Sequence, residues 1–158
     1  MTRFAEGDIS GDFSGGVLAP NGKIYATSWR ISEGILVIDP SDDSVQVKEK
    51  NETAWWKNVS GAVLGQDENV YGMPDDIRNG VLKYDISEKN LSFVGDGQIS
   101  QNGQTSGGAV APNGVIYGTP RDAPGILRFD PETEDLSLIG TSIMTEIRND
   151  HSAGSGLY

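Results

Sequence analysis

The side chains best suited to chemistry lie in the segments that we expect to be the longer loops of this chain. Tryptophan offers an aromatic face for a sugar ring or a partner protein, and arginine is common at the energetic centre of interfaces. Asparagine and aspartate add hydrogen bonds and charge beside them. The candidate ligand-binding residues are Trp29, Arg30, Trp55, Trp56, Asn58, Asp75, Asp76, Arg121, Asp122 and His151.

Nucleophilic and metal catalysis have few residues to use. The chain has no cysteine, and a serine triad could use only its single histidine, His151. The pairs Asp42-Asp43 and Asp75-Asp76 could hold calcium through oxygen ligands, but such pairs are more often solvated turns. We therefore expect no catalytic residue, no bound metal and no cofactor, and we lean towards a protein that is not an enzyme.

Composition narrows the classes of partner. Twelve Lys and Arg residues against 23 Asp and Glu residues give the 158-residue chain a formal net charge of −11, which disfavours nucleic acid and anionic membranes. No signal peptide and no apolar segment of membrane-spanning length is visible. We expect a soluble chain, and the compartment stays open because the absence of cysteine fits several locations.

The elements that must position these residues repeat three times. Residues 14–26, 60–72 and 106–118 share one pattern, and their tyrosines Tyr25, Tyr71 and Tyr117 are 46 residues apart. A second block, GILVIDP from Gly34, returns as GVLKYDI and GILRFDP at nearly the same spacing. A third apolar segment closes each unit, so the chain is a repeat array rather than one irregular domain.

Each unit divides into four short strands with tight turns between them. In the first unit we expect strands at 17–19, 23–26 and 35–39, and a fourth that begins at Val45. Pro20-Asn21-Gly22 and Asp39-Pro40-Ser41 supply the turn residues between strands. Four antiparallel strands in about 46 residues predict an all-β fold, a β-propeller with three blades in this chain.

The blocks GGVLAPNGKIY and VIDP resemble the repeat of a β-propeller family without a characterised function, and more loosely kelch, streptogramin-lyase and gluconolactonase-type blades. The resemblance extends from about Ser14 to Gly140 and implies the fold but not the activity. Gluconolactonase-type propellers hold a divalent metal in the tunnel. The expected inner strands here, GGVLAP, GAVLGQ and GGAVAP, carry no carboxylate, which argues against such a metal.

The repeat divides the chain into blade 1 (14–59), blade 2 (60–105) and blade 3 (106–151). Residues 1–13 resemble the remnant of a preceding outer strand, and 152–158 resemble the start of a further inner strand. Three blades leave a propeller ring open, because closed rings have about four to eight. Either a second chain completes a ring of six blades, or other blades of a longer protein or a neighbouring chain do so.

Long loops on a rigid scaffold are where function usually lies. We expect a non-catalytic binding or scaffold module that binds protein or carbohydrate through the face with the long loops. Two alternatives stay open: a hydrolase or lyase using loop carboxylates, and a structural subunit of a larger assembly. The tryptophans could also be core residues, although Trp29 aligns with the polar Asp75 and Arg121 in the other units, which favours a functional role.

Overall fold

The chain folds into three four-stranded antiparallel sheets, one for each sequence repeat. The computed structural model describes residues 11–30, 34–49 and 57–146. Within these ranges the strands are β1 (Phe13–Leu18), β2 (Ile24–Ser28), β3 (Ile35–Asp39), β4 (Ser44–Lys48), β5 (Val59–Leu64), β6 (Val70–Pro74), β7 (Val81–Asp85), β8 (Asn90–Val94), β9 (Thr105–Val110), β10 (Ile116–Pro120), β11 (Ile126–Asp130) and β12 (Asp135–Ile139). A short 3-10 turn, η3 (Ile77–Asn79), follows β6, and residues 141–146 form a helical turn after β12.

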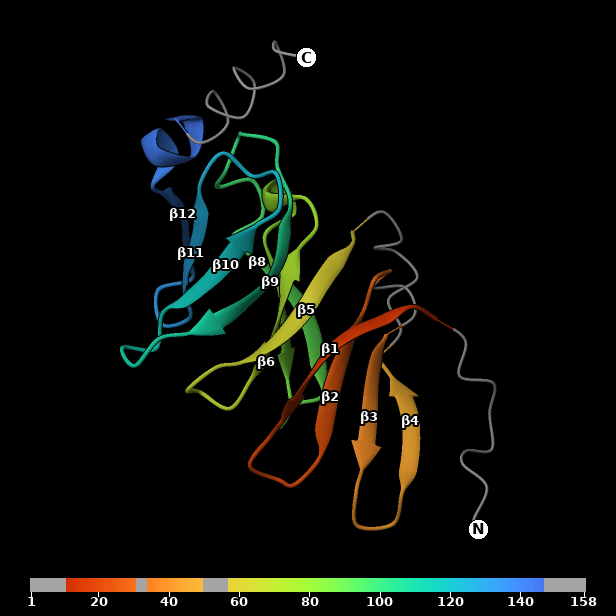
Figure 1. Cartoon of the computed structure of the whole chain (residues 1–158). Coiled ribbons are helices and arrows are strands. Elements are labelled where there is room, and N and C mark those ends of the chain that lie inside the picture. Colours follow the sequence, from red (N-terminus) through yellow and green to blue (C-terminus); the bar gives the residue numbers. More distant parts are fainter. Residues whose placement is uncertain (1–10, 31–33, 50–56, 147–158) are drawn as a thin grey trace.

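Each sheet has its strands in sequence order, as expected for a propeller blade. Figure 1 shows the three sheets side by side, with β1, β5 and β9 next to one another as the inner strands and blades 1 and 3 at opposite ends of the row. The all-β propeller fold is therefore confirmed. None of the helices in the described ranges is long and apolar enough to cross a membrane.

The second strand of each blade is longer than the sequence pattern indicated. We expected β2 to end at Ala26, but it continues to Ser28, which pairs with Phe13 at the start of the inner strand. The register shifts between Ser14 and Val17, where Gly15 takes a φ of +65°. This bulge lets pairing resume beyond it, so Thr27 and Ser28 belong to the strand. The second strands of blades 2 and 3 extend in the same way to Pro74 and Pro120, past similar shifts of register.

The hydrophobic core lies between the blades. One cluster joins blades 1 and 2, with Tyr25, Ile35 and Leu82 among its buried members. The other joins blades 2 and 3 around Tyr71 and Phe129, whose ring centroids are 5.4 Å apart. Successive residues of a strand point to opposite faces of its sheet, and both faces of blade 2 are covered, so every residue of β6 is buried.

The repeated tyrosine fixes the first turn of its blade in the first two repeats. In blade 2 the Tyr71 hydroxyl donates a hydrogen bond of 2.7 Å to Asp67, and in blade 1 the Asn21 amide donates one of 2.9 Å to the Tyr25 hydroxyl. Burial is the main cause of a raised Tyr71 pKa, and the bond to Asp67 adds to it. The turn residue thus satisfies the polar end of a buried aromatic ring.

Candidate ligand-binding site

Backbone hydrogen bonds place corresponding residues of successive blades at the same end of the sheets. The residue after each second strand donates its N–H to the carbonyl of the residue before the inner strand of the same blade. These bonds are Trp29 to Asp12 at 2.6 Å, Asp75 to Asn58 at 2.9 Å and Arg121 to Gln104 at 2.8 Å. The repeat therefore brings two polar positions per blade next to the inner strands.

Side chains from blades 2 and 3 meet at this end in a polar cluster, which consists of Asn58, Asp75, Gln104, Arg121 and Asp122. The Gln104 amide donates to Asp75 Oδ2 at 3.4 Å, and the Arg121 guanidinium donates to Gln104 Oε1. Arg121 also lies 3.5 Å from Asp75 Oδ1 as an ion pair across the two blades. Asp122 accepts a hydrogen bond of 2.5 Å from the Gln104 backbone N–H.

Asp75 is the most unusual member of the polar cluster. Only 8% of the residue is exposed, and its Oδ1 atom has no hydrogen-bond partner among the described residues. Burial raises the pKa of its carboxyl group, and the charges of Asp122 and Asp76 add to this rise, whereas Arg121 and a hydrogen bond with the Asn58 side chain oppose it. The buried Asp75 carboxylate therefore anchors the half-exposed Arg121 guanidinium, which is the part of the ion pair that a ligand can reach.

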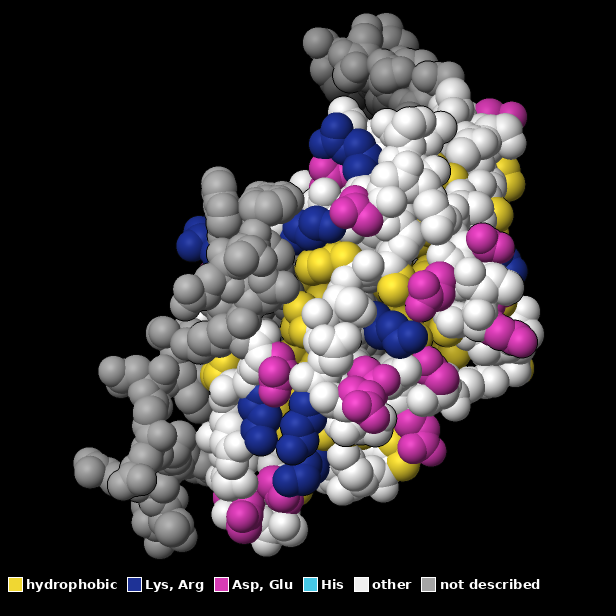
Figure 2. All heavy atoms as spheres, turned by 180° about the vertical axis from the view of Figure 1, so that it is seen from behind, with side chains coloured by type: hydrophobic (Ala, Val, Ile, Leu, Met, Phe, Trp, Pro, Cys, Tyr) yellow, Lys and Arg dark blue, Asp and Glu magenta, His cyan; other side chains and the backbone are white. Residues whose placement is uncertain are grey.

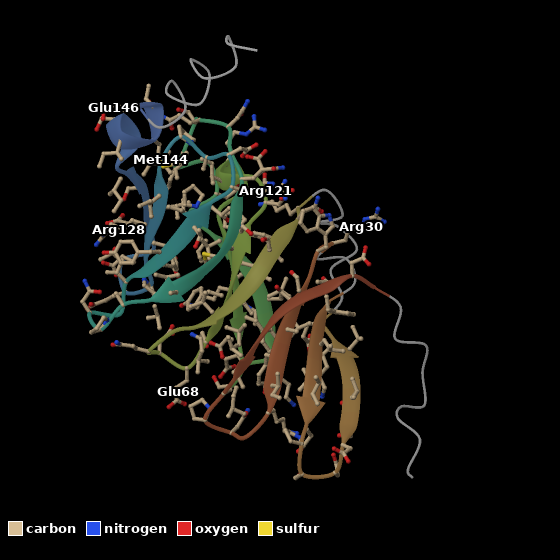
Figure 3. All side chains as sticks on the ribbon, in the orientation of Figure 1. Arg30, Glu68, Arg121, Arg128, Met144 and Glu146 are labelled. Carbon is tan, nitrogen blue, oxygen red and sulfur yellow. The ribbon has the colours of Figure 1, made fainter. Side chains whose placement is uncertain are left out.

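Several predicted residues lie at the same end but outside the polar cluster. Asp76 caps the 3-10 turn η3 and binds Arg78 at 2.5 Å, and this pairing lowers the pKa of Asp76. Arg30 is exposed and forms an isolated β-bridge with Asn58, and the half-buried Trp29 accepts a backbone hydrogen bond from Val59. Figure 3 shows Arg30 and Arg121 at one end of the blades and Glu68 at the other. Trp55, Trp56 and His151 lie outside the described residues.

Sequence reasoning missed one member of the polar cluster. Gln104 links Asp75 to Arg121, and the signal that could have identified it is its position 46 residues after Asn58, which was selected. Lys57 binds Asp96 at 2.7 Å and lies 4.3 Å from the centroid of the Phe93 ring. Its role is structural, because this buried side chain ties the segment before β5 to the end of β8.

A hollow of about 300 Å³ lies away from the polar cluster, between blades 1 and 2, and is lined in part by Lys23, Lys48 and Lys89. Lys23 binds Asp39 there at 2.8 Å, and this hydrogen bond is the main reason that the pKa of Asp39 falls to about 2. Seen from behind, Lys and Arg side chains lie in small groups beside acidic ones (Figure 2). The described residues contain no cluster of three or more Asp, Glu or His side chains suited to a metal ion.

Comparison with solved structures supports the fold. The chain is similar to virginiamycin B lyase from Staphylococcus aureus, with a TM-score of 0.61 and 15% identity over 79% of this chain and 40% of that one. It is also similar to a gluconolactonase from Xanthomonas campestris (TM-score 0.60, 13% identity, 83% and 48% covered) and to a luciferin-regenerating enzyme (TM-score 0.56, 16% identity, 80% and 46% covered). No protein-family model matches the chain, and no curated protein matches its sequence.

These structures are six-bladed propellers, and the chain spans less than half the length of each. The three sheets described above correspond to about 40% of such a ring. The chain therefore adopts the fold of three blades of a β-propeller, and further blades are needed to close a ring of this kind.

Proposed function

We propose that the chain is a non-catalytic β-propeller binding module whose ring is completed by further blades, and that it binds carbohydrate at the end of the sheets where the polar cluster lies. The observation that carries this proposal is the half-exposed guanidinium of Arg121, held 3.5 Å from the buried Asp75 carboxylate beside the Gln104 amide. Carboxylate, amide and guanidinium groups together match the alternating hydroxyl donors and acceptors of a sugar.

The blade repeat supports a site at this position. Trp29, Asp75 and Arg121 occupy the same place in their blades yet differ in type, so the fold does not prescribe them. Trp29 supplies a half-buried aromatic side chain in blade 1, and the backbone of its neighbour Arg30 is bridged to Asn58. An aromatic face beside fixed polar groups favours a sugar ring over an extended peptide.

A glycan array of neutral, amino and acidic sugars, followed by titration of the full chain with the best sugar, tests this function. Arg121→Ala should weaken binding about tenfold or more while the chain stays folded, as checked by its far-UV circular dichroism. The control Arg78→Ala removes the same charge from an exposed ion pair outside the cluster and should leave affinity unchanged. Absence of any bound glycan, or equal loss in both variants, would overturn the carbohydrate site.

Acid–base catalysis is a second candidate, because burial raises the pKa of Asp75 and the similar structures include a lyase and a gluconolactonase by name. In this alternative, Asp75 exchanges a proton with the substrate while Arg121 stabilises negative charge. Assays of lactone opening with the full chain and with Asp75→Asn would distinguish the two. Turnover that disappears in the variant would favour catalysis, whereas binding without turnover would favour the module.

A further inference from the structure

Two sheet faces at the ends of the blade row have no blade against them among the described residues. In blade 1 the free face consists of Ile24, Ala26, Leu36, Ile38, Val45 and Val47, which pair with one another across β2, β3 and β4. We call this the leading face. Its opposite face carries Tyr25 and Val37, which pack against blade 2.

The leading face has the composition of a buried surface. Its counterparts in blade 3 include Ile116, Leu127 and Phe129, and all three are fully buried against blade 2. In blade 1 the corresponding Ile24, Leu36 and Ile38 are only half-buried. Leu18, which pairs with Ile24 on the same face, is 63% exposed. Such an apolar surface on one side of a sheet is typical of an interface.

The other free face belongs to blade 3, and we call it the trailing face. It includes Tyr117, which pairs with Arg128, and Ile126, which pairs with Ile139. The residue Tyr71, at the place of Tyr117 in blade 2, is fully buried, whereas Tyr117 is only half-buried and Ile139 is 40% exposed. The trailing face therefore repeats the surface with which blade 2 packs against blade 3.

The inner strands also lack a neighbour at the trailing face. A Cβ atom added to Gly15 would lie 2.9 Å from the Cα atom of Gly61, and one added to Gly61 would lie 2.9 Å from the Cα atom of Gly107. At Gly107, whose φ is +79°, an added Cβ atom would meet nothing within 4 Å. The close glycine contact that joins neighbouring inner strands is thus made twice and is missing at the trailing face.

The charged residues on the two free faces indicate which chain covers them. Lys83 of blade 2 lies 3.5 Å from Glu134 of blade 3. The residue of blade 3 at the position of Lys83 is Arg128, and the residue of blade 1 at the position of Glu134 is Asp43. Asp43 and Glu134 share the same unusual backbone, with φ values of 57° and 59°. The two free faces therefore carry opposite charges at the positions where blades 2 and 3 form their ion pair.

We propose that a second copy of this chain closes the ring, with the leading face of each copy packed on the trailing face of the other. This rests on the proposed completion of the ring by further blades and specifies which blades they are. The contact is made twice about a two-fold axis, and two sets of three blades give the six of the similar structures. Arg128 of one copy pairs with Asp43 of the other, and Tyr117 packs on Ile38. Figure 3 shows Arg128 at the outer edge of blade 3, directed away from the other blades.

Light scattering of the full chain, with charge reversals at the seam, tests the proposal. The native chain should have twice its 16.9 kDa mass. Arg128→Glu and Asp43→Lys should each weaken dimerisation about tenfold, because each places like charges at both seams. Lys is the residue that blade 2 has at the position of Asp43. Mixing the two variants, or combining both changes in one chain, should restore the dimer.

The matched control is Glu68→Lys, which makes the same charge change at an exposed residue with a φ of 64° in the β5–β6 turn, away from both free faces. It should leave the dimer intact. A native chain that stays monomeric, or a dimer insensitive to both reversals, would overturn the proposed seam. A monomer that still binds sugar would overturn the seam alone, and a dimer that binds none would overturn the carbohydrate site alone.

Discussion

Shortening the equivalent leucine to alanine in two different blades tests the packing between blades, on which the fold and the proposed ring both depend. Leu127 and Leu36 occupy the same place in the third strand of blades 3 and 1. Leu127 is fully buried against blade 2, whereas Leu36 is half-buried on the leading face. The substitutions Leu127→Ala and Leu36→Ala remove the same atoms from two environments.

The expected magnitudes follow from burial. Leu127→Ala leaves a cavity between two sheets and should lower the free energy of unfolding by about 3 kcal/mol, within the range for buried leucines. Leu36→Ala should cost about 1 kcal/mol in the isolated chain, because only part of its side chain is removed from water. Since a domain of this size has roughly 5–15 kcal/mol of stability, the first loss is large but permits folding.

Urea unfolding at several protein concentrations measures both effects. In dilute protein, Leu127→Ala should shift the midpoint far more than Leu36→Ala. At concentrations where the chain is dimeric, the loss from Leu36→Ala should grow, because the second copy covers this side chain. A loss below about 1 kcal/mol for Leu127→Ala would refute the packing described between blades 2 and 3.

Two further predictions concern the inner strands and the polar cluster. Gly61→Ala should lower the free energy of unfolding by about 2 kcal/mol or more, because the new Cβ atom would lie 2.9 Å from Gly107 Cα at a residue with a φ of +78°. Gly107→Ala, measured at protein concentrations where the chain is monomeric, should cost only about 1 kcal/mol of backbone strain. Asp75→Asn should gain stability relative to the native chain as the pH rises from 3.8, the ordinary pKa of an aspartate, through the raised pKa of Asp75, because the carboxyl group ionises first in the unfolded chain. Urea unfolding between acidic and neutral pH measures this difference, and a native chain that gains stability over the variant would contradict it.

Much of the fold could be predicted because local chemistry repeats. The turn residues, the alternation of apolar side chains and the spacing of Tyr25, Tyr71 and Tyr117 all report on one blade, and the third strands have the bounds that the pattern indicated. The ends of the second strands could not be predicted in this way. Ser28 pairs with Phe13 only because a bulge at Gly15 restores the register, and such pairing depends on tertiary structure.

Most members of the polar cluster could be chosen from the sequence, because their residue types are suited to binding. Asp75 and Arg121 were selected for their residue types, and the blade geometry brings them to 3.5 Å. Gln104 was not selected, because glutamine in a polar loop carries no signal of its own. Its importance depends on two neighbours that lie 29 and 17 residues away in the sequence. Burial of Asp75 is likewise a property of the packed blades and not of its sequence neighbours.

Positions at which the three repeats differ carry the information that the shared fold does not. Where the repeats agree, as at the inner-strand glycines Gly15, Gly61 and Gly107 and at the repeated tyrosine, the residues maintain a blade. Among the positions where they differ, two sets are charged and lie where blades meet: the residues after the second strands, among them Asp75 and Arg121, and the positions of Asp43 and Arg128 on the two free faces. A fold with equivalent blades needs neither change. Both sets place opposite charges where two blades meet or could meet. Differences between the repeats therefore indicate contacts between blades, and such contacts can in turn form a site for a ligand.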